Sequence, residues 1–371
     1  MAVKPIDSRL ACESGVARVT IDDVARAAGV SKATVSRFLN HREQLLTPEI
    51  ASRVEAAVAA LGYSPNPMAQ ALKRGRTRLI GLVVADVTNP FSVAVLRGAE
   101  KACQQAGYLL MLFNLGNDWQ REREAIEALS AYQVDGFILN TLGRDAGSLD
   151  VAARYGKPVV LVDRRCENMR SDFVSLDNAG AVQLAVQHLD DAGYRELLFV
   201  SEPVLGLSSR RERQTAFRHA VHDLARQADS TDAMAGGVLE ISADDAVGLD
   251  EALGALRQRA GRRLPAVVAS NAVITLRVVA AAVRLGWRLG GDLGLIGIDD
   301  TEWSAYVGPG LSAIAQPTDE LGRVAATCLI ERLHGLDLPP RQILLAGRLM
   351  ARGSTRDAID AVGERVHEGF Y

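Results

Sequence analysis

The stretch VTIDDVARAAGVSKATVSRFLN, residues 19–40, decides how the first part of this chain folds. Thr20 is suited to cap a helix, and two aspartates follow in the first turn, where the helix dipole favours acidic side chains. Apolar residues recur at helical spacing until Gly29, a residue type that commonly ends helices. Ser31 is suited to cap a second helix. Two short helices joined by a tight turn that contains glycine are typical of a helix-turn-helix unit.

A third helix is predicted after Thr47, which caps it, with Pro48 at its first position and Gly62 at its end. Three such helices can bury a small shared core and leave the start of the second helix exposed. In helix-turn-helix proteins that part of the second helix enters the major groove of DNA. Arg37 can bond guanine there as a fork, or hold a phosphate. The DNA contacts predicted in this part of the chain are Thr20, Ser31, Lys32, Ala33, Thr34, Arg37 and Asn40.

The distribution of charge supports nucleic acid as a partner. Residues 1–78 contain 12 Lys and Arg residues and 7 Asp and Glu residues, a net charge of +5, although the whole chain carries −3. The remainder therefore carries −8. A basic segment on an acidic body suits a polyanion. Two alternatives stay open at this point: a charged terminus that is merely solvated, and a helical packing module that exposes a cationic helix.

Length and composition describe an ordinary globular protein of two or three domains. The chain has 371 residues, of which 48% are hydrophobic and 23% charged. No apolar run approaches the roughly 20 residues of a membrane span, and the N-terminus lacks the apolar core of a signal peptide. We therefore expect a cytoplasmic protein with no membrane partner. Its four cysteines are scattered, which predicts neither disulfides nor a zinc site, and no metal or cofactor is expected.

From Leu79 onwards, short apolar runs alternate with helical stretches. A first series comprises LIGLVVAD, YLLMLFN, GFILN and PVVLVD, and a second begins with FVSLD and continues with ELLFVS, GVLEIS, AVVAS and LGLIGID. This alternation predicts parallel sheets covered by helices on both faces. QQAGYLLMLF and DDAGYRELLFV echo each other, which indicates two similar halves. Ligands of such sheets bind at the carboxyl ends of the strands, here facing each other across a cleft.

An enzyme would need a chemical constellation that the sequence does not contain. It has no P-loop, no G-x-G-x-x-G after the first strand and no G-x-S-x-G elbow. His219, His222 and Asp223 lie on a charged helix, where a solvated face is a simpler interpretation than a metal site. The alternative that stays open is a sugar-binding protein or sugar-modifying enzyme whose helical head does not bind DNA. That alternative leaves residues 19–76 unexplained.

VTIDDVARAAGVSKATVSRFLN followed by LGYSPNPMAQALKRGRTRLIGLVV resembles the lactose/galactose repressor family of bacterial transcription regulators. The resemblance extends from about Val19 to Thr355. It implies an α/β fold with a three-helix helix-turn-helix head and a hinge helix. A periplasmic-binding-protein-like body of two doubly wound parallel-sheet subdomains follows. The function implied is sequence-specific repression, with an operator affinity that a small sugar-type effector controls.

The resemblance assigns the segment after the third helix to a hinge helix that is ordered on operator DNA. Pro65 and Pro67 stop the third helix from continuing, and PMAQALKR is shorter than the ~12 residues that an isolated helix needs. Leu72 matches the family's leucine that inserts from the minor groove at a central C-G step of a pseudo-palindrome. Packing of Leu72 onto the body is the alternative. The hinge contacts expected are Asn66, Ala69, Leu72 and Lys73.

The family's effector contacts fall on strand ends of the body. They match Phe91, Asn140, Asp163, Arg164, Arg213, Asn271 and Asp299. Many members have Asn-Asp where this chain has Asn271-Ala272. The supply of arginine at 164, 165, 210, 211 and 213 favours a sugar acid such as gluconate or 2-ketogluconate. GVSKATVSRFLN with LLMLFNLGND is also similar to regulators of gluconate and 2-ketogluconate use. A neutral sugar, with these arginines paired to surface acids, is the alternative.

The expected domain boundaries follow from these assignments. They are a flexible tail over 1–18, a helix-turn-helix domain over 19–65, a hinge helix and linker over 66–77, and an effector-binding and dimerisation domain over 78–371. Its first half is expected to combine about 78–172 with 317–335, and its second about 173–316 with 336–355. The family dimerises through its body, so that two heads read a palindrome. The C-terminal AIDAVGERVHEGF is too short for a tetramerising coil, so a homodimer is expected.

Overall fold

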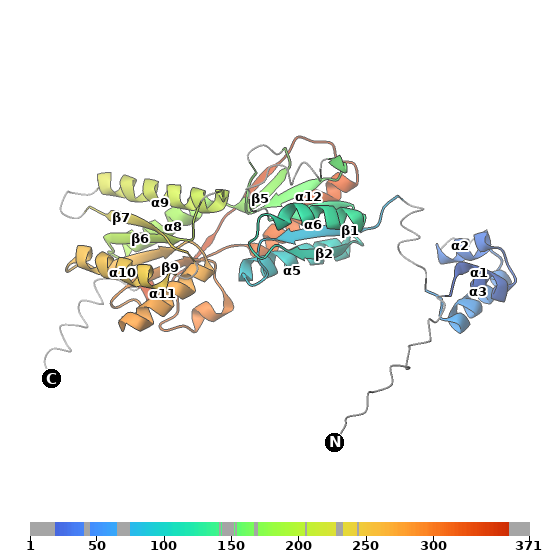
Figure 1. The fold of residues 1–371 in the computed structure, drawn as a ribbon, viewed down its shortest axis with the longest axis horizontal. Coiled ribbons are helices and arrows are strands. Elements are labelled where there is room, and N and C mark those ends of the chain that lie inside the picture. Colours follow the sequence, from blue (N-terminus) through green and yellow to red (C-terminus); the bar gives the residue numbers. More distant parts are fainter. Residues whose placement is uncertain are drawn as a thin grey trace, which may run out of the picture. The chain divides into compact units, whose positions relative to one another are not determined.

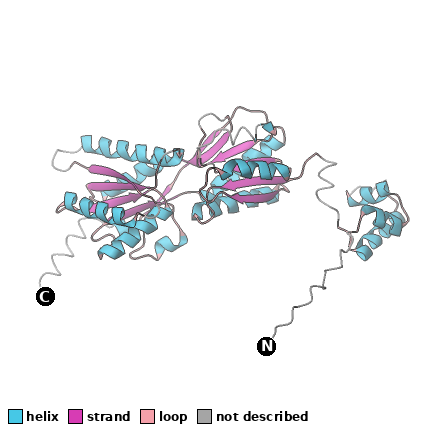
Figure 2. Ribbon diagram, viewed as in Figure 1, coloured by secondary structure: helices cyan, strands magenta, loops and turns pink. Residues whose placement is uncertain are grey.

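The computed structural model describes residues 19–40, 45–64, 75–140, 142, 152, 154–166, 170–204, 206–227, 233–242 and 245–355. Two compact units are present, and the division between them lies between Thr77 and Arg78 (Figure 1). We call residues 19–64 the head and the described residues from Arg78 onwards the body. The head consists of helices only, whereas the body combines strands and helices (Figure 2).

Three helices form the head: α1 (Ile21–Ala28), α2 (Lys32–Leu39) and α3 (Pro48–Leu61). The predicted caps are present. Thr20 and Asp23 form a capping box, in which each side chain accepts the backbone N–H of the other residue. Two further caps start α2 and α3: the Ser31 hydroxyl accepts the backbone N–H of Thr34, and the Thr47 hydroxyl accepts that of Ile50.

The turn between α1 and α2 is held in place by a residue of α3. Gly29 ends α1 with a φ of 62°, a conformation that favours glycine. The guanidinium of Arg53 donates to the carbonyl oxygens of Ala28 at 2.5 Å and Gly29 at 3.2 Å. Arg53 therefore satisfies carbonyls at the end of α1 and ties α3 to the turn. The core beneath consists of Val24, Ala25, Ala28, Val35, Val54 and Ala57.

The first half of the body is a six-stranded sheet with the order β11-β5-β4-β3-β1-β2. All neighbours in it are parallel. Its strands are β1 (Leu79–Val84), β2 (Leu109–Asn114), β3 (Gly136–Leu139), β4 (Val159–Val162), β5 (Asp172–Leu176) and β11 (Gln342–Leu345). Helices α5 (Pro90–Gln105) and α12 (Thr318–Leu333) share one core with it, and α6 (Arg121–Ala131) contributes to the core on its other face.

The close contact between α5 and α12 depends on two glycines. A Cβ on Gly98 would lie 1.9 Å from the carbonyl oxygen of Asp319, and one on Gly322 would lie 2.0 Å from that of Val95. Because backbone is the obstacle in both cases, no side chain fits at either position. Helix α12, which is far from α5 in sequence, is thereby fixed against the first sheet.

The second half is a six-stranded sheet with the order β12-β10-β9-β8-β6-β7, in which only the pair of β10 and β12 is antiparallel. Its strands are β6 (Glu196–Ser201), β7 (Ala235–Glu240), β8 (Pro265–Ala269), β9 (Gly294–Ile298), β10 (Ser312–Ala315) and β12 (Arg348–Met350). Two pairs of helices cover its faces: α8 (Asn178–Asp191) with α9 (Ser208–Gln227), and α10 (Ala246–Ala260) with α11 (Ala272–Leu285). The short 3-10 helices η2 and η3 span Glu302–Ala305 and Gly353–Thr355.

The boundary expected between the halves at about residue 173 is wrong. Strand β5 pairs with β4 and therefore belongs to the first sheet, and so does β11, which was expected in the second half. The chain crosses between the halves after β5, after β10 and after β11. The apolar run FVSLD predicts a buried strand, but only pairing across the fold decides which sheet receives it.

No helix in the described part of the chain is long and apolar enough to cross a membrane.

Candidate functional site

A cavity of about 310 Å³ lies between the two halves of the body, where the strands of both sheets end. Parallel sheets bind ligands at these carboxyl ends, and the volume lies within the range of small-molecule sites. The structure brings together all seven residues that were expected at an effector site. They are Phe91, Asn140, Asp163, Arg164, Arg213, Asn271 and Asp299.

Two aspartates occupy equivalent positions on opposite sides of this cavity. Asp163 directly follows β4, and its N–H donates to the carbonyl of Val174 in β5 at 2.9 Å. Asp299 directly follows β9, and its N–H donates to the carbonyl of Ile314 in β10 at 3.0 Å. Both adopt positive φ, 66° and 86°, which is uncommon for a residue other than glycine. Each half of the body thus presents one strand-end carboxylate to the cavity.

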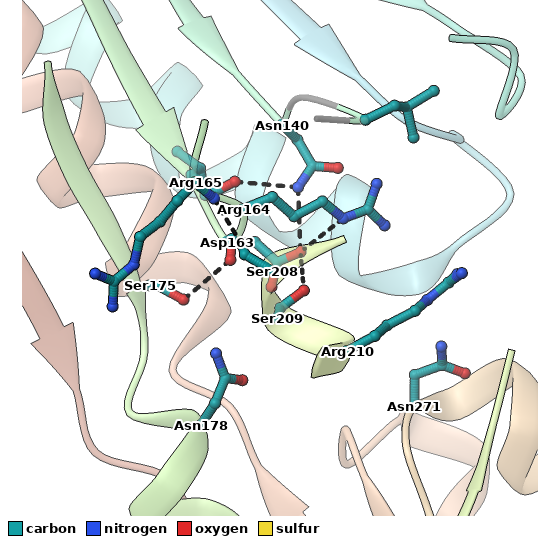
Figure 3. Close-up of polar contacts among 12 residues, drawn as sticks. Asn140, Asp163, Arg164, Arg165, Ser175, Asn178, Ser208, Ser209, Arg210 and Asn271 are labelled. Atoms are coloured by element: carbon teal, nitrogen blue, oxygen red, sulfur yellow. Dashed lines mark hydrogen bonds and ion pairs between the residues drawn. The ribbon is translucent and has the colours of Figure 1, made fainter. Parts of the chain in front are cut away.

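The carboxylate of Asp163 is surrounded by donors (Figure 3). It accepts hydrogen bonds from Asn140 Nδ2 at 3.3 Å and from Ser209 Oγ at 3.4 Å. Nε of Arg164 lies 3.3 Å from one of its oxygens, and Nη2 of Arg213 lies 3.9 Å from the other. Two cations therefore balance this buried charge, one from the same strand end and one from α9.

Arg213 joins four elements at the cavity wall. Its Nε donates to Asn178 Oδ1 at the start of α8, and its Nη1 donates to the carbonyl of Ser270 at the end of β8, both at 2.7 Å. Its third nitrogen faces Asp163 of the first half. The side chain is 6% exposed, so these bonds are shielded from solvent. Arg213 thus links the two halves of the body at the cavity wall.

Sequence analysis missed one acid of the site, Glu202. Its carboxylate accepts from Arg210 Nη2 and from Asn271 Nδ2, both at 2.7 Å. Burial lowers the pKa of Arg210, and the cations Arg164 and Arg213 lower it further, against the opposing effect of Glu202 and Asp163. Glu202 directly follows β6, so the rule that strand ends carry the site would have identified it.

The carboxyl group of Asp299 is held away from bulk water. Burial raises its pKa from 3.8 to about 6, although Arg213 and hydrogen bonds from the Ala272 N–H and the Gln316 amide act in the opposite direction. The two bonds measure 3.2 Å and 2.5 Å. Near neutral pH this group can therefore exchange a proton when its surroundings change.

Not every expected arginine reaches the cavity. Arg164 and Arg165 point in opposite directions from the end of β4 (Figure 3). The guanidinium of Arg165 lies 4.9 Å from the centre of the Phe173 ring, and its Nε lies 3.4 Å from Glu212. Arg211 is exposed and does not line the cavity either. A fourth lining arginine comes instead from Arg277 on α11, which sequence analysis did not single out.

The head presents part of the predicted DNA-binding set at the start of α2. Ser31, Lys32 and Ala33 are exposed there, and Arg37 is exposed one turn later. Lys32 Nζ lies 2.6 Å from Asp22, but both side chains are about half exposed, so the pair is weak and can be exchanged for a phosphate. These side chains form an accessible surface along one side of the helix.

The remaining predicted contacts of the head have roles within it as well. Thr34 accepts or donates a bond with the Ser31 hydroxyl at 2.9 Å, and Asn40 Nδ2 donates to the Ser36 carbonyl at 2.6 Å. Thr20 belongs to the capping box of α1. The hinge residues Asn66, Ala69, Leu72 and Lys73, and the segments 1–18 and 356–371, lie outside the described residues.

The histidines of α9 do not assemble a metal site with other described residues. No group of three or more His, Cys, Asp or Glu side chains suited to a metal ion occurs in the described part of the chain. His222 and Asp223 are exposed, and their nearest side-chain atoms are 3.5 Å apart.

A helix-turn-helix head and a body with a polar cavity between two parallel sheets define a DNA-binding transcription regulator controlled by a small molecule. Residues 20–66 match the model for bacterial regulatory proteins of the lacI family, and residues 186–355 match that for a periplasmic binding protein-like domain. The chain belongs to the lacI family of bacterial regulatory proteins.

Full-length relatives support this assignment. The HTH-type transcriptional regulator PtxS of Pseudomonas plecoglossicida is 48% identical over 338 residues, which cover 91% of this chain and 96% of that protein. The HTH-type transcriptional regulator KdgR of Bacillus subtilis is 36% identical over 340 residues, which cover 90% of this chain and 97% of that protein. The structure of the lac repressor dimer bound to operator and the anti-inducer ONPF superimposes with a TM-score of 0.77 at 25% sequence identity. The match covers 91% of this chain and 99% of the lac repressor chain.

These relatives confirm the family, the fold class and the regulatory function that the sequence predicted. They are named as regulators of transcription, so the chain is a regulator and not an enzyme. Regulators of this family bind operator DNA and small-molecule effectors.

Proposed function

We propose that this regulator is a repressor whose effector is a sugar acid of the gluconate or 2-ketogluconate type. The observation that carries this proposal is the composition of the cavity wall, which combines four arginines with four acids: Arg164, Arg210, Arg213, Arg277, Asp86, Asp163, Glu202 and Asp299. Carboxylates are suited to accept bonds from sugar hydroxyls. A guanidinium is suited to bind a carboxylate with two parallel bonds, which are stronger than bonds between neutral groups.

A neutral sugar is the second candidate, and the internal ion pairs favour it. Arg210 is paired with Glu202 and Arg164 with Asp163, so these guanidinium groups are already balanced by protein carboxylates. Titration calorimetry with gluconate, 2-ketogluconate, D-glucose and D-ribose separates the two candidates. Binding of at least one acid with no comparable binding of the neutral sugars supports the proposal. Binding of a neutral sugar alone rejects the acid effector.

The start of α2 is proposed as the surface that reads bases. Arg37, Lys32 and Ala33 are its base readers, and Ser31, Thr34, Asn40 and Thr20 support it through phosphate contacts or through the fold of the head. Lysine and arginine contacts displace counterions from DNA, so the affinity for operator should fall steeply as salt rises. Equal affinity for a candidate pseudo-palindrome with a central C-G step and for random duplex, at every salt concentration, rejects sequence-specific reading by this surface.

A homodimer is proposed as the unit that binds this palindrome. Large apolar side chains are exposed on α11 and on β2, one of the two edge strands of the first sheet: Leu276, Val283, Leu109 and Leu112. Val283 is 75% and Leu109 69% exposed in the single chain, which is costly unless another surface covers them. The lac repressor structure with the same fold is described as a dimer. Sedimentation of the full chain tests this, and a monomer at micromolar concentration rejects it.

A further inference from the structure

Arg277 occupies a special position on α11. The helix starts at Asn271, whose side chain accepts the N–H of Ile274 at 2.9 Å. Ile274, Val278 and Ala281 then face the hydrophobic core. Val273 and Arg277 lie one turn apart on another side of the helix, and both line the cavity. The side chain of Arg277 is therefore directed by the helix into the ligand site.

The four cavity arginines differ in their interaction partners within the protein. Arg210 pairs with Glu202, Arg164 with Asp163, and Arg213 donates to two protein oxygens at 2.7 Å. For Arg277, by contrast, no ion pair or hydrogen bond to a described residue is found. Its Nη1 is fully buried and has no hydrogen-bond partner among the described residues. A buried charged donor without an acceptor is unfavourable and calls for a function.

A second buried atom without a partner lies in the wall of the same cavity. Gln316 follows β10 and donates its amide nitrogen to Asp299, which leaves its oxygen, Oε1, buried without a hydrogen-bond partner among the described residues. Among the described residues, the cavity therefore offers a buried guanidinium donor with neither a hydrogen bond nor an ion pair, Arg277 Nη1, and a buried neutral acceptor, Gln316 Oε1. The buried Nε of Arg164 is instead paired with the Asp163 carboxylate at 3.3 Å. A molecule that carries both an anionic group and hydroxyl groups would satisfy both atoms.

We infer that Arg277 binds the anionic group of the effector, and that Gln316 Oε1 accepts a bond from one of its hydroxyls. This inference rests on the proposed function, because it names the residue that selects an acid over a neutral sugar. Arg164, Arg210 and Arg213 hold the wall and its carboxylates in place. Arg277 supplies the cation that the ligand neutralises.

The test compares acids with their neutral counterparts. Binding of gluconate and D-glucitol, and of 2-ketogluconate and D-fructose, is measured by titration calorimetry on the full chain and on Arg277→Gln. The variant is expected to bind the preferred acid at least about tenfold more weakly, since a charge-assisted bond is lost. Affinity for the neutral counterpart should stay within about threefold. The ratio of the two affinities is the decisive readout, because general damage to the cavity would weaken both.

A matched control lies on the same helix. Arg284 of α11 forms an exposed ion pair with Asp250 and does not line the cavity, so Arg284→Gln should leave the binding of the acid unchanged. Arg277→Lys retains the charge without the planar fork and should fall between the wild type and Arg277→Gln. If Arg277→Gln does not fold, a selective loss of acid binding in Arg277→Lys supports the inference, and an unchanged ratio rejects it.

The possible failures can be told apart. If the wild type binds an acid and Arg277→Gln binds it equally well, Arg277 is not the anchor, but the proposed function stands. If the wild type binds neutral sugars and neither acid, the proposed function fails, and the inference fails with it. If both acid and neutral counterpart weaken equally in Arg277→Gln, the residue shapes the cavity and does not select charge.

Discussion

At the scale of single residues, the site combines features that favour ligand binding over stability. Asp163 and Asp299 both adopt positive φ, and Asp299 in addition keeps a carboxyl group in a poorly solvated place. Such strain is found where function requires it, because selection for stability alone would remove it. We therefore expect that some substitutions of cavity residues stabilise the fold and at the same time abolish the response to the ligand.

Asp299→Asn should be such a substitution. A carboxyl pKa raised from 3.8 to about 6 means that the folded state holds its proton more tightly than the unfolded state. The stability therefore falls as pH rises from about 4 to 6 and stays lower above that range, by up to about 3 kcal/mol. Asparagine carries no charge, so at pH 7.5 the variant should be about 1–3 kcal/mol more stable, and the gain should shrink as pH approaches 4.

Chemical denaturation at pH 5 and pH 7.5 measures this difference, and calorimetry measures the accompanying loss of effector binding. The neighbouring Asp300 is the control. It pairs with Arg352 through two bonds of 2.7 and 2.9 Å, so Asp300→Asn should destabilise the protein. An Asp299→Asn variant that is less stable than the wild type at pH 7.5 would contradict the assignment of a poorly solvated carboxylate.

The residues of the site were predictable to the extent that they follow strands. Asn140, Asp163 and Asp299 each come directly after a strand, Asn271 comes one residue later, and all four line the cavity. Arg277 could not be found in this way. It lies inside a helix, where only the packing of α11 decides that the side of the helix carrying Val273 faces the ligand and not solvent.

At the scale of elements, local chemistry and long-range pairing differ in how well they can be predicted. The caps at Thr20, Ser31 and Thr47 and the glycines that end α1 and α3 depend on neighbouring residues only, and all were predicted. The placement of β11 depends on β5, a partner more than 100 residues away along the chain, whereas β5 pairs both with β11 and with the nearby β4. The pattern of FVSLD does not contain that information, so the boundary between the halves was misplaced.

A charge cluster helps to hold β5 in the first sheet. Asp172, at the start of β5, is buried and accepts bonds from Arg332 of α12 and from Arg341 just before β11. Although burial alone would raise it, hydrogen bonds from these two arginines hold the pKa of Asp172 well below its usual range. One carboxylate thereby connects β5 with α12 and with the start of β11, through residues 160 and 169 positions further along the chain.

Asp172→Asn should therefore cost about 2–4 kcal/mol of stability at pH 7, because two partly buried guanidinium groups lose their counter-charge. The depressed pKa contributes stability that is present above about pH 4 and is lost as pH falls below it. The difference between wild type and variant should accordingly shrink below pH 4. Urea denaturation over this range is the measurement. Asp250→Asn, which breaks an exposed pair with Arg284, is the control and should cost less than about 1 kcal/mol.

The hinge element yields a separate prediction. Leu72 is a large apolar residue in the short cationic segment PMAQALKR, which should form a stable helix only on DNA. Leu72→Ala should weaken operator binding by a few kcal/mol, since an apolar wedge in the minor groove is lost, and should leave the melting temperature unchanged. Fluorescence anisotropy on operator DNA and a thermal melt test this together. A variant that melts earlier and binds operator normally would assign Leu72 to packing.

At the scale of the whole molecule, regulation requires that the body transmits ligand occupancy to the head. The chain crosses between the halves of the body after β5, after β10 and after β11, so a change in their relative position is carried by three connections. The division after Thr77 agrees with the boundary drawn from the sequence, and the head has a core of its own. Substitutions in the cavity should therefore change the response to ligand without unfolding the head.

Arg213 offers the clearest test that the response to ligand can be lost while the head still binds DNA. It contacts Asn178 directly after the first crossing, Ser270 at the end of β8 and Asp163 across the cavity, and so connects both halves. Arg213→Ala should bind operator within about threefold of the wild type when no ligand is present, because α2 and its caps are unchanged. The effector should no longer alter that affinity, since both a ligand contact and the link between the halves are lost.

Operator binding measured with increasing effector tests this, with Arg218→Ala as the control, because Arg218 is exposed on the same helix, α9. If Arg213→Ala responds to the effector at the same concentration as the wild type, Arg213 neither binds the ligand nor transmits its presence. If the variant is folded but fails to bind operator without ligand, the halves of the body set the DNA-binding state themselves. Arg213 would then maintain that state in the absence of ligand.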